Sequence, residues 1–246
     1  MKILSMSTAT NYLSVALNEN ERVVEEANEK DQRNHSEKLD PTIDRLLKNQ
    51  YWQLKDIDRF AVASGPGSYT GLRIGVTTAK MFASILPGDL VAIPTLEAIA
   101  ANFSETDALL VTGLDARNDN YFAGGYVNQN GQPVNVMQDG HYHITKLVDQ
   151  VKIAANQPGI HRIIFAGTGF AKQAKLLDEL QMPWQLATED ENRVHAGQIG
   201  RLAVTAKPVD PDKLVPQYLR RTQAEMDWHK RTGKPFAPDS DYVEEV

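Results

Sequence analysis

The sequence predicts an α/β fold made of two similar units, and three observations lead to this prediction. Strand-like and helix-like segments alternate along the chain, which is typical of a mixed sheet covered by helices. A strand–turn–strand–turn–strand pattern occurs at the start and again near residue 109, and helices follow each copy. The 246 residues, 41% of them hydrophobic, can bury the core of one large domain or two modest ones. The repeated pattern indicates two related domains of the ribonuclease H-like kind, with the cleft between them as the default ligand site.

The first unit begins with three short strand-like segments and continues with alternating helices and strands. Its expected strands are residues 3–7, 13–17, 22–27, 57–64 and 90–93, and polar turns separate the first three. A helix is expected to begin at an N-cap residue, Ser36, and to turn Leu39 and Ile43 toward the core. Pro41 lies inside this pattern and should kink the helix or delay its start.

A second helix is expected at 72–86, directly after a glycine-rich turn, and a third at 95–102. Gly75, Ala79 and Ala83 recur in the second helix at four-residue spacing, so they share one face. Small residues on one face let another element approach closely. That element is either a partner helix or the sheet of the same chain.

The second unit repeats this order of elements. Its expected strands are residues 109–112, 121–127, 133–138 and 162–166, and its expected helices are 144–155, 170–180 and 196–206. We expect an N-terminal domain over 1–104 and, over 105–231, a smaller second domain with a C-terminal segment able to pack back on the first. Residues 232–246 hold two prolines and four carboxylates and should form a flexible tail.

The composition excludes several classes of protein. The chain has no cysteine, which excludes disulfides, thiolate metal sites and a cysteine nucleophile. No apolar run approaches the roughly 20 residues that span a bilayer, and the N-terminus does not read as a signal peptide. We therefore expect a cytoplasmic protein without membrane contact. The net charge of −6 argues against a general nucleic-acid coat protein, because Lys and Arg drive phosphate binding.

The glycine-rich segment 65–75 follows an expected strand and opens an expected helix. Backbone N–H groups at such a place can cradle an anion. The segment lacks the lysine of a Walker A loop, and its glycine spacing differs from the dinucleotide-binding fingerprint. A tight strand-to-helix turn with a purely structural role explains the same glycines.

The carboxylates give an incomplete phosphotransfer site. An actin-like site places an acid at the end of the first strand of each domain, where the acids hold magnesium and orient water. Asp115 occupies this point in the second unit, but Ser7 occupies it in the first. This departure argues against ATP hydrolysis, although an ATPase or phosphotransferase that uses Asp115 stays as the alternative hypothesis. The histidines show no metal-binding spacing, and we expect no metal on this chain.

The C-terminal segment mixes basic and aromatic residues. Arg220, Arg221, Lys230 and Arg231 lie near Tyr218 and Trp228. Such interleaving can contact RNA, but a run of this kind is more often the solvated face of a terminal segment. Both hypotheses stay open from composition alone.

Several segments resemble one protein family, TsaB (YeaZ). Residues 64–75 read Ser-Gly-Pro-Gly-Ser-Tyr-Thr-Gly-Leu-Arg-Ile-Gly and are close to that family's signature. Weaker matches follow in the family's order and cover nearly the whole chain: residues 1–17, His35-Ser36-Glu37, Asp115-Ala116-Arg117 and Tyr218-Leu219-Arg220. The family usually has Asp-Thr where this chain has Ser7-Thr8, which weakens any expectation of magnesium-dependent nucleotide binding here.

The resemblance implies an actin/Hsp70-like (ASKHA) fold and a non-catalytic subunit of the machinery that makes threonylcarbamoyladenosine (t6A) in tRNA. Its partner would be a TsaD-like subunit, which transfers threonylcarbamoyl to N6 of adenosine 37 in tRNAs that read codons beginning with A. A TsaE-like ATPase would join them, and tRNA would bind through the complex. ATP and metal are expected on the partner subunits, and no cofactor on this chain.

The resemblance also implies two sets of site residues. The first two helices form the family's pairing surface, which also serves homodimers of the isolated chain. The corresponding residues here are His35, Ser36, Leu39, Ile43, Tyr69, Thr70, Arg73, Gly75, Ala79 and Ala83. A nucleotide cleft would be lined by Ser7, Thr8, Asp115 and Gly167.

Overall fold

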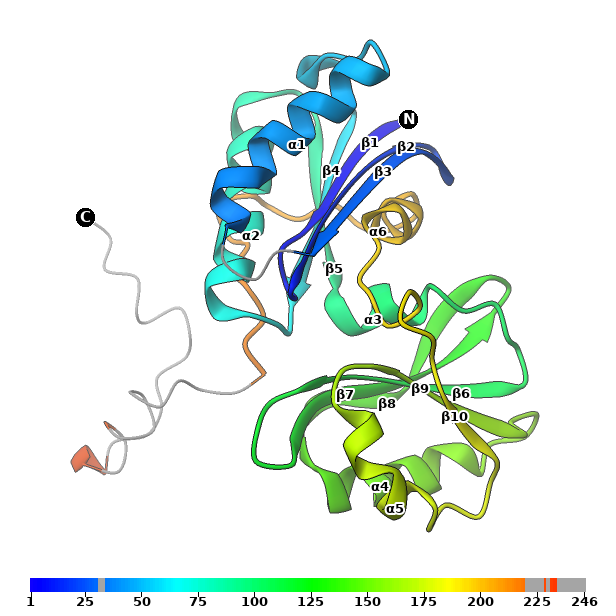
Figure 1. Cartoon of the computed structure of the whole chain (residues 1–246). Helices are drawn as coiled ribbons and strands as arrows, with labels where there is room; N and C mark the ends of the chain where they lie inside the picture. The colour runs from blue at the N-terminus through cyan, green and yellow to red at the C-terminus, as the bar shows by residue number, and fades with distance from the viewer. Residues whose placement is uncertain (31–33, 220–227, 229–230, 234–246) are drawn as a thin grey trace.

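The computed structural model describes residues 1–30, 34–219, 228 and 231–233, and it contains two five-stranded sheets (Figure 1). The strands of the first sheet are β1 (Lys2–Ser7), β2 (Tyr12–Glu19), β3 (Arg22–Lys30), β4 (Arg59–Gly65) and β5 (Asp89–Pro94). Those of the second are β6 (Ala108–Asp115), β7 (Asn120–Gln129), β8 (Gln132–His143), β9 (Arg162–Gly167) and β10 (Trp184–Leu186).

Both sheets have the same topology. The orders are β3-β2-β1-β4-β5 and β8-β7-β6-β9-β10, so each sheet has its first strand in the centre. In each, the first three strands form an antiparallel meander, and the fourth and fifth run parallel to the first. This repetition confirms the predicted α/β fold of two ribonuclease H-like domains. It also confirms that Ser7 and Asp115 end equivalent strands.

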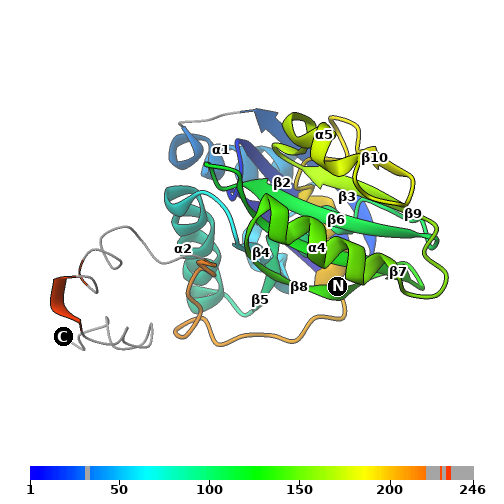
Figure 2. The same ribbon diagram turned by 90° about the horizontal axis from the view of Figure 1, so that it is seen from below.

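Helices cover the outer faces of both sheets and fill the space between them (Figures 1 and 2). The outer face of the first sheet carries α1 (His35–Asn49) and α2 (Tyr69–Ile85), and the outer face of the second carries α4 (Ile144–Ala155), η2 (Phe170–Gln173) and α5 (Ala174–Leu177). Between the sheets lie α3 (Thr95–Ala100) and α6 (Ala196–Ala203). A short helix, η1 (Leu54–Asp56), precedes β4.

One hydrophobic cluster joins the two domains. It combines Ile3 and Val91 of the first sheet, Ile199 of α6, and Leu110 and Ile164 of the second sheet. Because the two domains share this core, burial of apolar surface holds them together. Within the described ranges, no helix is both long enough and apolar enough to cross a membrane.

The helix α6 follows the second domain in sequence but packs on the first sheet. Its first N–H groups donate to side chains of that sheet: Ala196 to Ser14 Oγ at 2.7 Å and Gly197 to Glu26 Oε1 at 2.8 Å. At its far end, the Arg59 guanidinium forms two hydrogen bonds with the Asp89 carboxylate and donates to the carbonyl of Ala203. Polar groups of the first domain therefore satisfy backbone groups at both ends of the helix, where no intrahelical partner exists.

Several predicted boundaries are wrong. The N-cap of α1 is Asn34 rather than Ser36, and the helix continues through Pro41. The helix α2 begins three residues earlier than predicted, because Ser68 accepts a hydrogen bond from the Gly71 N–H and acts as its N-cap. The helix predicted at 170–180 consists of the two short pieces η2 and α5. The three-residue strand β10 was not predicted.

Candidate functional site

A cleft of 650 Å³ lies where the two domains face each other. Its walls come from three turns that follow strands or precede a helix: residues 9–11 after β1, 67–69 before α2, and 114–117 at the end of β6. Phe122 and Thr168 complete the lining. The predicted interdomain cleft therefore exists, and of the four residues predicted to line it, only Asp115 does so.

The carboxylate of Asp115 is occupied by contacts within its own domain. Its Oδ2 accepts a hydrogen bond from Lys172 Nζ at 2.9 Å, and its Oδ1 accepts one from the Arg117 N–H at 2.8 Å. Burial acts to raise the pKa of this carboxyl, but Lys172 and the Arg117 N–H outweigh it, and the pKa is lowered. Asp115 is thus an ionised turn residue already paired with a cation.

The other three predicted cleft residues form hydrogen bonds or close contacts with the backbone around them. Ser7 Oγ accepts from the Ala9 N–H at 3.3 Å. Thr8 is buried, and its hydroxyl donates to the Gly71 carbonyl at 2.6 Å and accepts from the Gly75 N–H at 3.1 Å. Gly167 has a φ of 113° and a position where a Cβ would collide with the Gly113 carbonyl.

The glycine-rich segment has a structural explanation. A Cβ at Gly67 would collide with the Ala9 carbonyl, and one at Gly71 with the Thr8 carbonyl. The glycines therefore let the start of α2 lie directly against the backbone that follows β1. This geometry favours the structural interpretation of the segment over an anion cradle.

The predicted pairing residues divide into a buried and an exposed set. His35, Leu39, Ile43, Gly75 and Ala79 are buried in the chain itself. Exposed are Ser36, Tyr69, Thr70 and Arg73, and Ala83 is half-buried.

The small-residue face of α2 differs from the prediction, because Gly75 and Ala79 are buried within the chain itself. A Cβ at Gly75 would lie 2.5 Å from Thr8 Oγ1, and Ala79 packs in the core between the sheet and the outer helices. The small residues therefore bring α2 close to its own sheet, and their face is not available to a partner.

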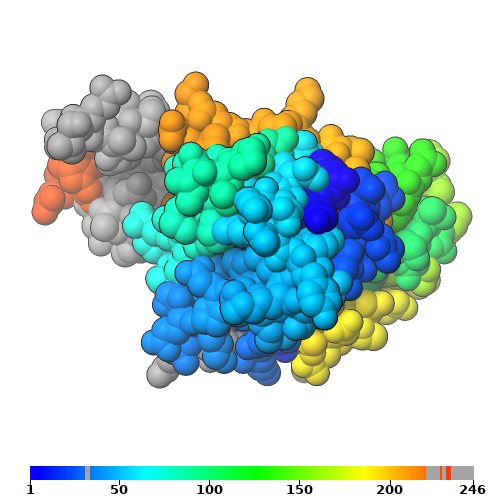
Figure 3. Space-filling model, turned by 90° about the horizontal axis from the view of Figure 1, so that it is seen from above, coloured from blue at the N-terminus to red at the C-terminus, as the bar shows by residue number. Residues whose placement is uncertain are grey.

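The exposed side of α2 carries apolar residues outside the predicted pairing set. Met81 is 47% exposed and Ile85 is 71% exposed, four residues further along the helix. Exposed Thr77 and half-buried Ile74 continue this stripe toward the start of α2. Figure 3 shows the end of the molecule where α1 and α2 lie side by side. The signal in the sequence was a second apolar spacing in α2, offset from the small residues.

The segment after α6 runs along α2 (Figures 1 and 2). Lys80 Nζ donates to the Leu214 carbonyl at 2.9 Å, and the Gln217 N–H donates to the Ser64 carbonyl at 2.7 Å. Tyr218 stacks on Tyr69 with ring centroids 5.0 Å apart and accepts a hydrogen bond from Arg73 Nε. Of the basic residues predicted to contact RNA, Arg231 is exposed, and Arg220, Arg221 and Lys230 lie outside the described residues, as does the predicted tail from residue 234.

Across the described part of the chain, no group of three or more His, Asp or Glu side chains is placed to hold a metal ion.

Comparisons with known proteins identify the family. The family model described as "TsaD: tRNA N6-adenosine threonylcarbamoyltransferase" matches residues 23–245. The tRNA threonylcarbamoyladenosine biosynthesis protein TsaB of Bacillus subtilis is 30% identical over 229 residues, which cover 93% of this chain and 98% of that protein. The protein of the same name from Haemophilus influenzae is 27% identical over 243 residues, covering 95% and 98%.

A tRNA N6-adenosine threonylcarbamoyltransferase of Methylorubrum extorquens matches a shorter stretch. It is 44% identical over 77 residues, 31% of this chain and 22% of that protein. The solved structure of YeaZ from Pseudomonas aeruginosa shares the fold, with a TM-score of 0.71 and 23% identity over 89% of this chain and 99% of that one. The chain therefore belongs to the family that the TsaD model describes, and within it to the TsaB (YeaZ) proteins.

Proposed function

We propose that the chain acts in t6A biosynthesis as a non-catalytic subunit that binds and activates a TsaD-like transferase. The two relatives that match nearly the whole chain are named as t6A biosynthesis proteins, which supports a role in this pathway. The single observation that carries the non-catalytic role is the state of the two strand ends. Asp115 is paired with Lys172, and Ser7 and Thr8 bond the backbone around them. In an actin-like phosphotransferase, side chains at these points hold metal and water.

The pairing surface in this proposal is the outer layer formed by α1 and α2. Met81 and Ile85 expose apolar side chains there, next to half-buried Ile74 and exposed Thr77, and exposed apolar side chains grouped on one helix are typical of interfaces. The TsaD family model also matches this chain, so a TsaD-like partner would have a related fold. Two related folds can pair through equivalent helices across a pseudo-twofold axis, as identical subunits do across a true one. The same face would make homodimers of the isolated chain.

The proposal assigns ATP and metal to the partner subunits. A TsaE-like ATPase would join the complex, and tRNA would bind through the complex as a whole. In this arrangement the chain supplies a surface and a position for its partner, and no reacting group.

The test is a mixing experiment with substitutions on the proposed face. Purified chain and the TsaD-like protein from the same cell are combined and measured by size exclusion with light scattering. Met81→Glu and Ile85→Glu should weaken the complex at least tenfold, because each places a charge in an apolar contact (about 1.4 kcal/mol or more). Ile153→Glu is the matched control, since Ile153 is 67% exposed on α4 of the second domain.

Each mixture is then assayed for threonylcarbamoyl transfer to tRNA. Activity should appear only when both proteins are present and should fall with complex formation. If the α2 variants bind as tightly as the control, the interface is wrong. ATP turnover by the isolated chain that disappears in Asp115→Asn would instead support the phosphotransferase alternative.

A further inference from the structure

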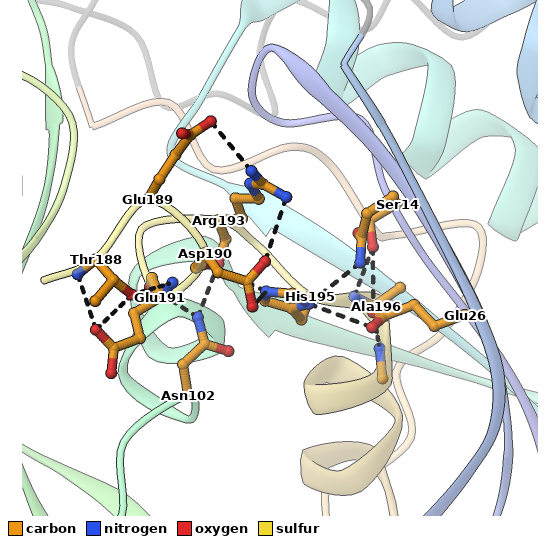
Figure 4. Close-up of polar contacts among 12 residues, drawn as sticks. Ser14, Glu26, Asn102, Thr188, Glu189, Asp190, Glu191, Arg193, His195 and Ala196 are labelled. Carbon is orange, nitrogen blue, oxygen red and sulfur yellow. Dashed lines mark hydrogen bonds and ion pairs between the residues drawn. The ribbon is translucent and has the colours of Figure 1, made fainter.

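The connection from β10 to α6, residues 187–195, is fastened to three parts of the molecule. The Asn102 side-chain amide donates to the carbonyls of Glu191 and Arg193 at 2.9 and 2.8 Å, which ties this connection to the one that enters the second domain. The Asn192 side chain accepts from the N–H of Gly167, at the end of β9. The last residue of the connection, His195, contacts Glu26 of β3 in the first sheet (Figure 4).

His195 lies between two acceptors, one at each ring nitrogen. Its Nδ1 is 3.2 Å from Glu26 Oε2, and its Nε2 is 3.1 Å from the carbonyl oxygen of Asp190. The side chains of His195 and Glu26 are 17% and 21% exposed, so water reaches the pair only in part. A hydrogen bond between two such side chains is stronger where water has limited access.

The two acceptors can be satisfied together only by the imidazolium form. The Asp190 carbonyl accepts and never donates, so Nε2 must carry a proton to bond it. An ionised Glu26 carboxylate also only accepts, so Nδ1 must carry a second proton to bond it. In neutral His195 with the Nε2 proton, Nδ1 presents a lone pair to the carboxylate and can only accept from Asn28 Nδ2, which is 3.2 Å away.

The charges around the ring favour its protonated form. Glu26 of β3 and Asp190 of the connection face it, with Asp190 Oδ2 at 3.7 Å from Nε2, and Glu191 lines the same small cavity. Arg193 is turned to Asp190 and Glu189, and the N-terminus of α6 directs the Gly197 N–H at Glu26. The Glu26 hydrogen bond raises the pKa of His195, and burial opposes it to a smaller extent. For Glu26, burial acts to raise the pKa, but His195 and the Gly197 N–H outweigh it and lower the pKa.

We propose that His195 is a proton-operated latch: doubly protonated, it fastens the interdomain connection to β3, and loss of one proton releases it. The pH window follows from the direction of each shift. Glu26 titrates below its ordinary value of 4.5, so its stabilisation is lost only as the pH falls below that value. His195 titrates above 6.5, so its stabilisation is complete below 6.5 and is lost as the pH rises through the raised pKa. The latch is closed between the pKa of Glu26 and the pKa of His195, and it opens as the pH rises above the pKa of His195.

Opening of the latch would affect the interdomain cleft through contacts between the connection and Tyr12. The Arg193 guanidinium lies 4.7 Å from the centre of the Tyr12 ring, and the Tyr12 hydroxyl donates to Glu189 Oε1 at 3.3 Å. Tyr12 directly follows Asn11, which lines the cleft. A loosened connection therefore removes support from one wall of the cleft.

Hydrogen–deuterium exchange on the full chain tests the latch. Exchange of the backbone amides of residues 188–197 is measured at about pH 6 and about pH 8.5 and corrected for the intrinsic rate, so that it reports local opening. Protection should fall with rising pH, by about tenfold for each pH unit by which the His195 pKa exceeds its ordinary value. The amides of α4 serve as an internal reference, because this helix packs in the second domain away from His195.

Two variants separate the latch from a general effect of pH. Gln does not titrate, and both of its N–H donors lie on one nitrogen, whereas His195 meets its two acceptors from different ring nitrogens. The protection of His195→Gln should therefore be low and equal at both pH values. His161→Gln is the matched control, since His161 is exposed and lies outside both the connection and α4. Equal protection at both pH values in the unsubstituted chain, or a pH response that persists in His195→Gln, would overturn the proposal. If His195→Gln does not fold, Glu26→Gln decides: the transition should move to lower pH, and an unmoved transition rejects the latch.

Discussion

The Thr8 hydroxyl bridges one turn of a helix from outside it. It donates to the Gly71 carbonyl and accepts from the Gly75 N–H, two groups that lie four residues apart in α2. An α-helix pairs such groups directly, and a side chain that enters the ladder locally separates them. Only a glycine at position 75 leaves room for this hydroxyl, because a Cβ would lie 2.5 Å from it.

Gly75→Ala should therefore destabilise the fold. The added methyl group must displace Thr8 and with it the end of β1, at a cost of about 1–3 kcal/mol. Urea denaturation should show a lower midpoint with an unchanged slope. Thr77→Ala on the exposed side of the same helix is the control and should change stability by less than about 0.5 kcal/mol. Equal midpoints for the two variants would show that the contact is easily relieved.

Individual residues were predictable where local pattern determines them. The equivalence of Ser7 and Asp115 follows from two meanders in one sequence, and the structure confirms it. Their partners were not predictable, because Lys172 lies 57 residues from Asp115 and Gly71 lies 63 residues from Thr8. No local spacing signals contacts over such separations.

Among the elements, α2 shows what periodicity can and cannot establish. The sequence correctly predicted a helix with a small-residue face, but a stripe of small residues has two interpretations. It allows close approach by a partner or by the protein's own sheet, and only tertiary structure distinguishes them. Gly75 and Ala79 face the sheet, whereas Met81 and Ile85 face outward.

The strand β10 could not be predicted, because its three residues are too few for an alternating pattern to be recognised.

The substitution Ala79→Glu therefore tests the buried face of α2. Ala79 is fully buried, so a carboxylate there should cost at least about 3 kcal/mol and lower the melting temperature sharply. Ile153→Glu, on the exposed side of α4 and outside the proposed pairing surface, should melt like the unsubstituted chain. Circular dichroism melts of both variants make the comparison. A folded Ala79→Glu variant with an unchanged melt would mean that this face is open to solvent.

At the scale of the whole molecule, the first sheet is completed by a helix from the far end of the chain. Without α6, the inner face of β1 and β2 would be exposed, and the cluster that joins Ile3, Val91 and Ile199 could not form. The two-unit pattern in the sequence indicated two domains. It did not show that a helix after the second domain packs on the first, because the bonds from Ala196 to Ser14 and from Gly197 to Glu26 span 182 and 171 residues.

A fragment of residues 1–104 should therefore fail to fold alone. Joining it to residues 194–219 through a short glycine–serine linker should restore folding, since Asn102 already contacts the carbonyl of Arg193. Size exclusion and denaturant unfolding of the two fragments make the comparison. Cooperative unfolding of residues 1–104 by themselves would show that α6 is dispensable for the first domain.

The position of α6 also sets the order in which the chain can fold during translation. Strand β5 ends at residue 94 and α6 ends at residue 203, so 109 further residues must be added before the first domain has all its parts. At about 5–20 residues per second, the nascent first sheet waits roughly 5–20 s with one apolar face uncovered. The second domain can close its own outer layer during this delay. During synthesis, the N-terminal half of this protein therefore stays incompletely folded, and accessible to chaperones, until α6 leaves the ribosome.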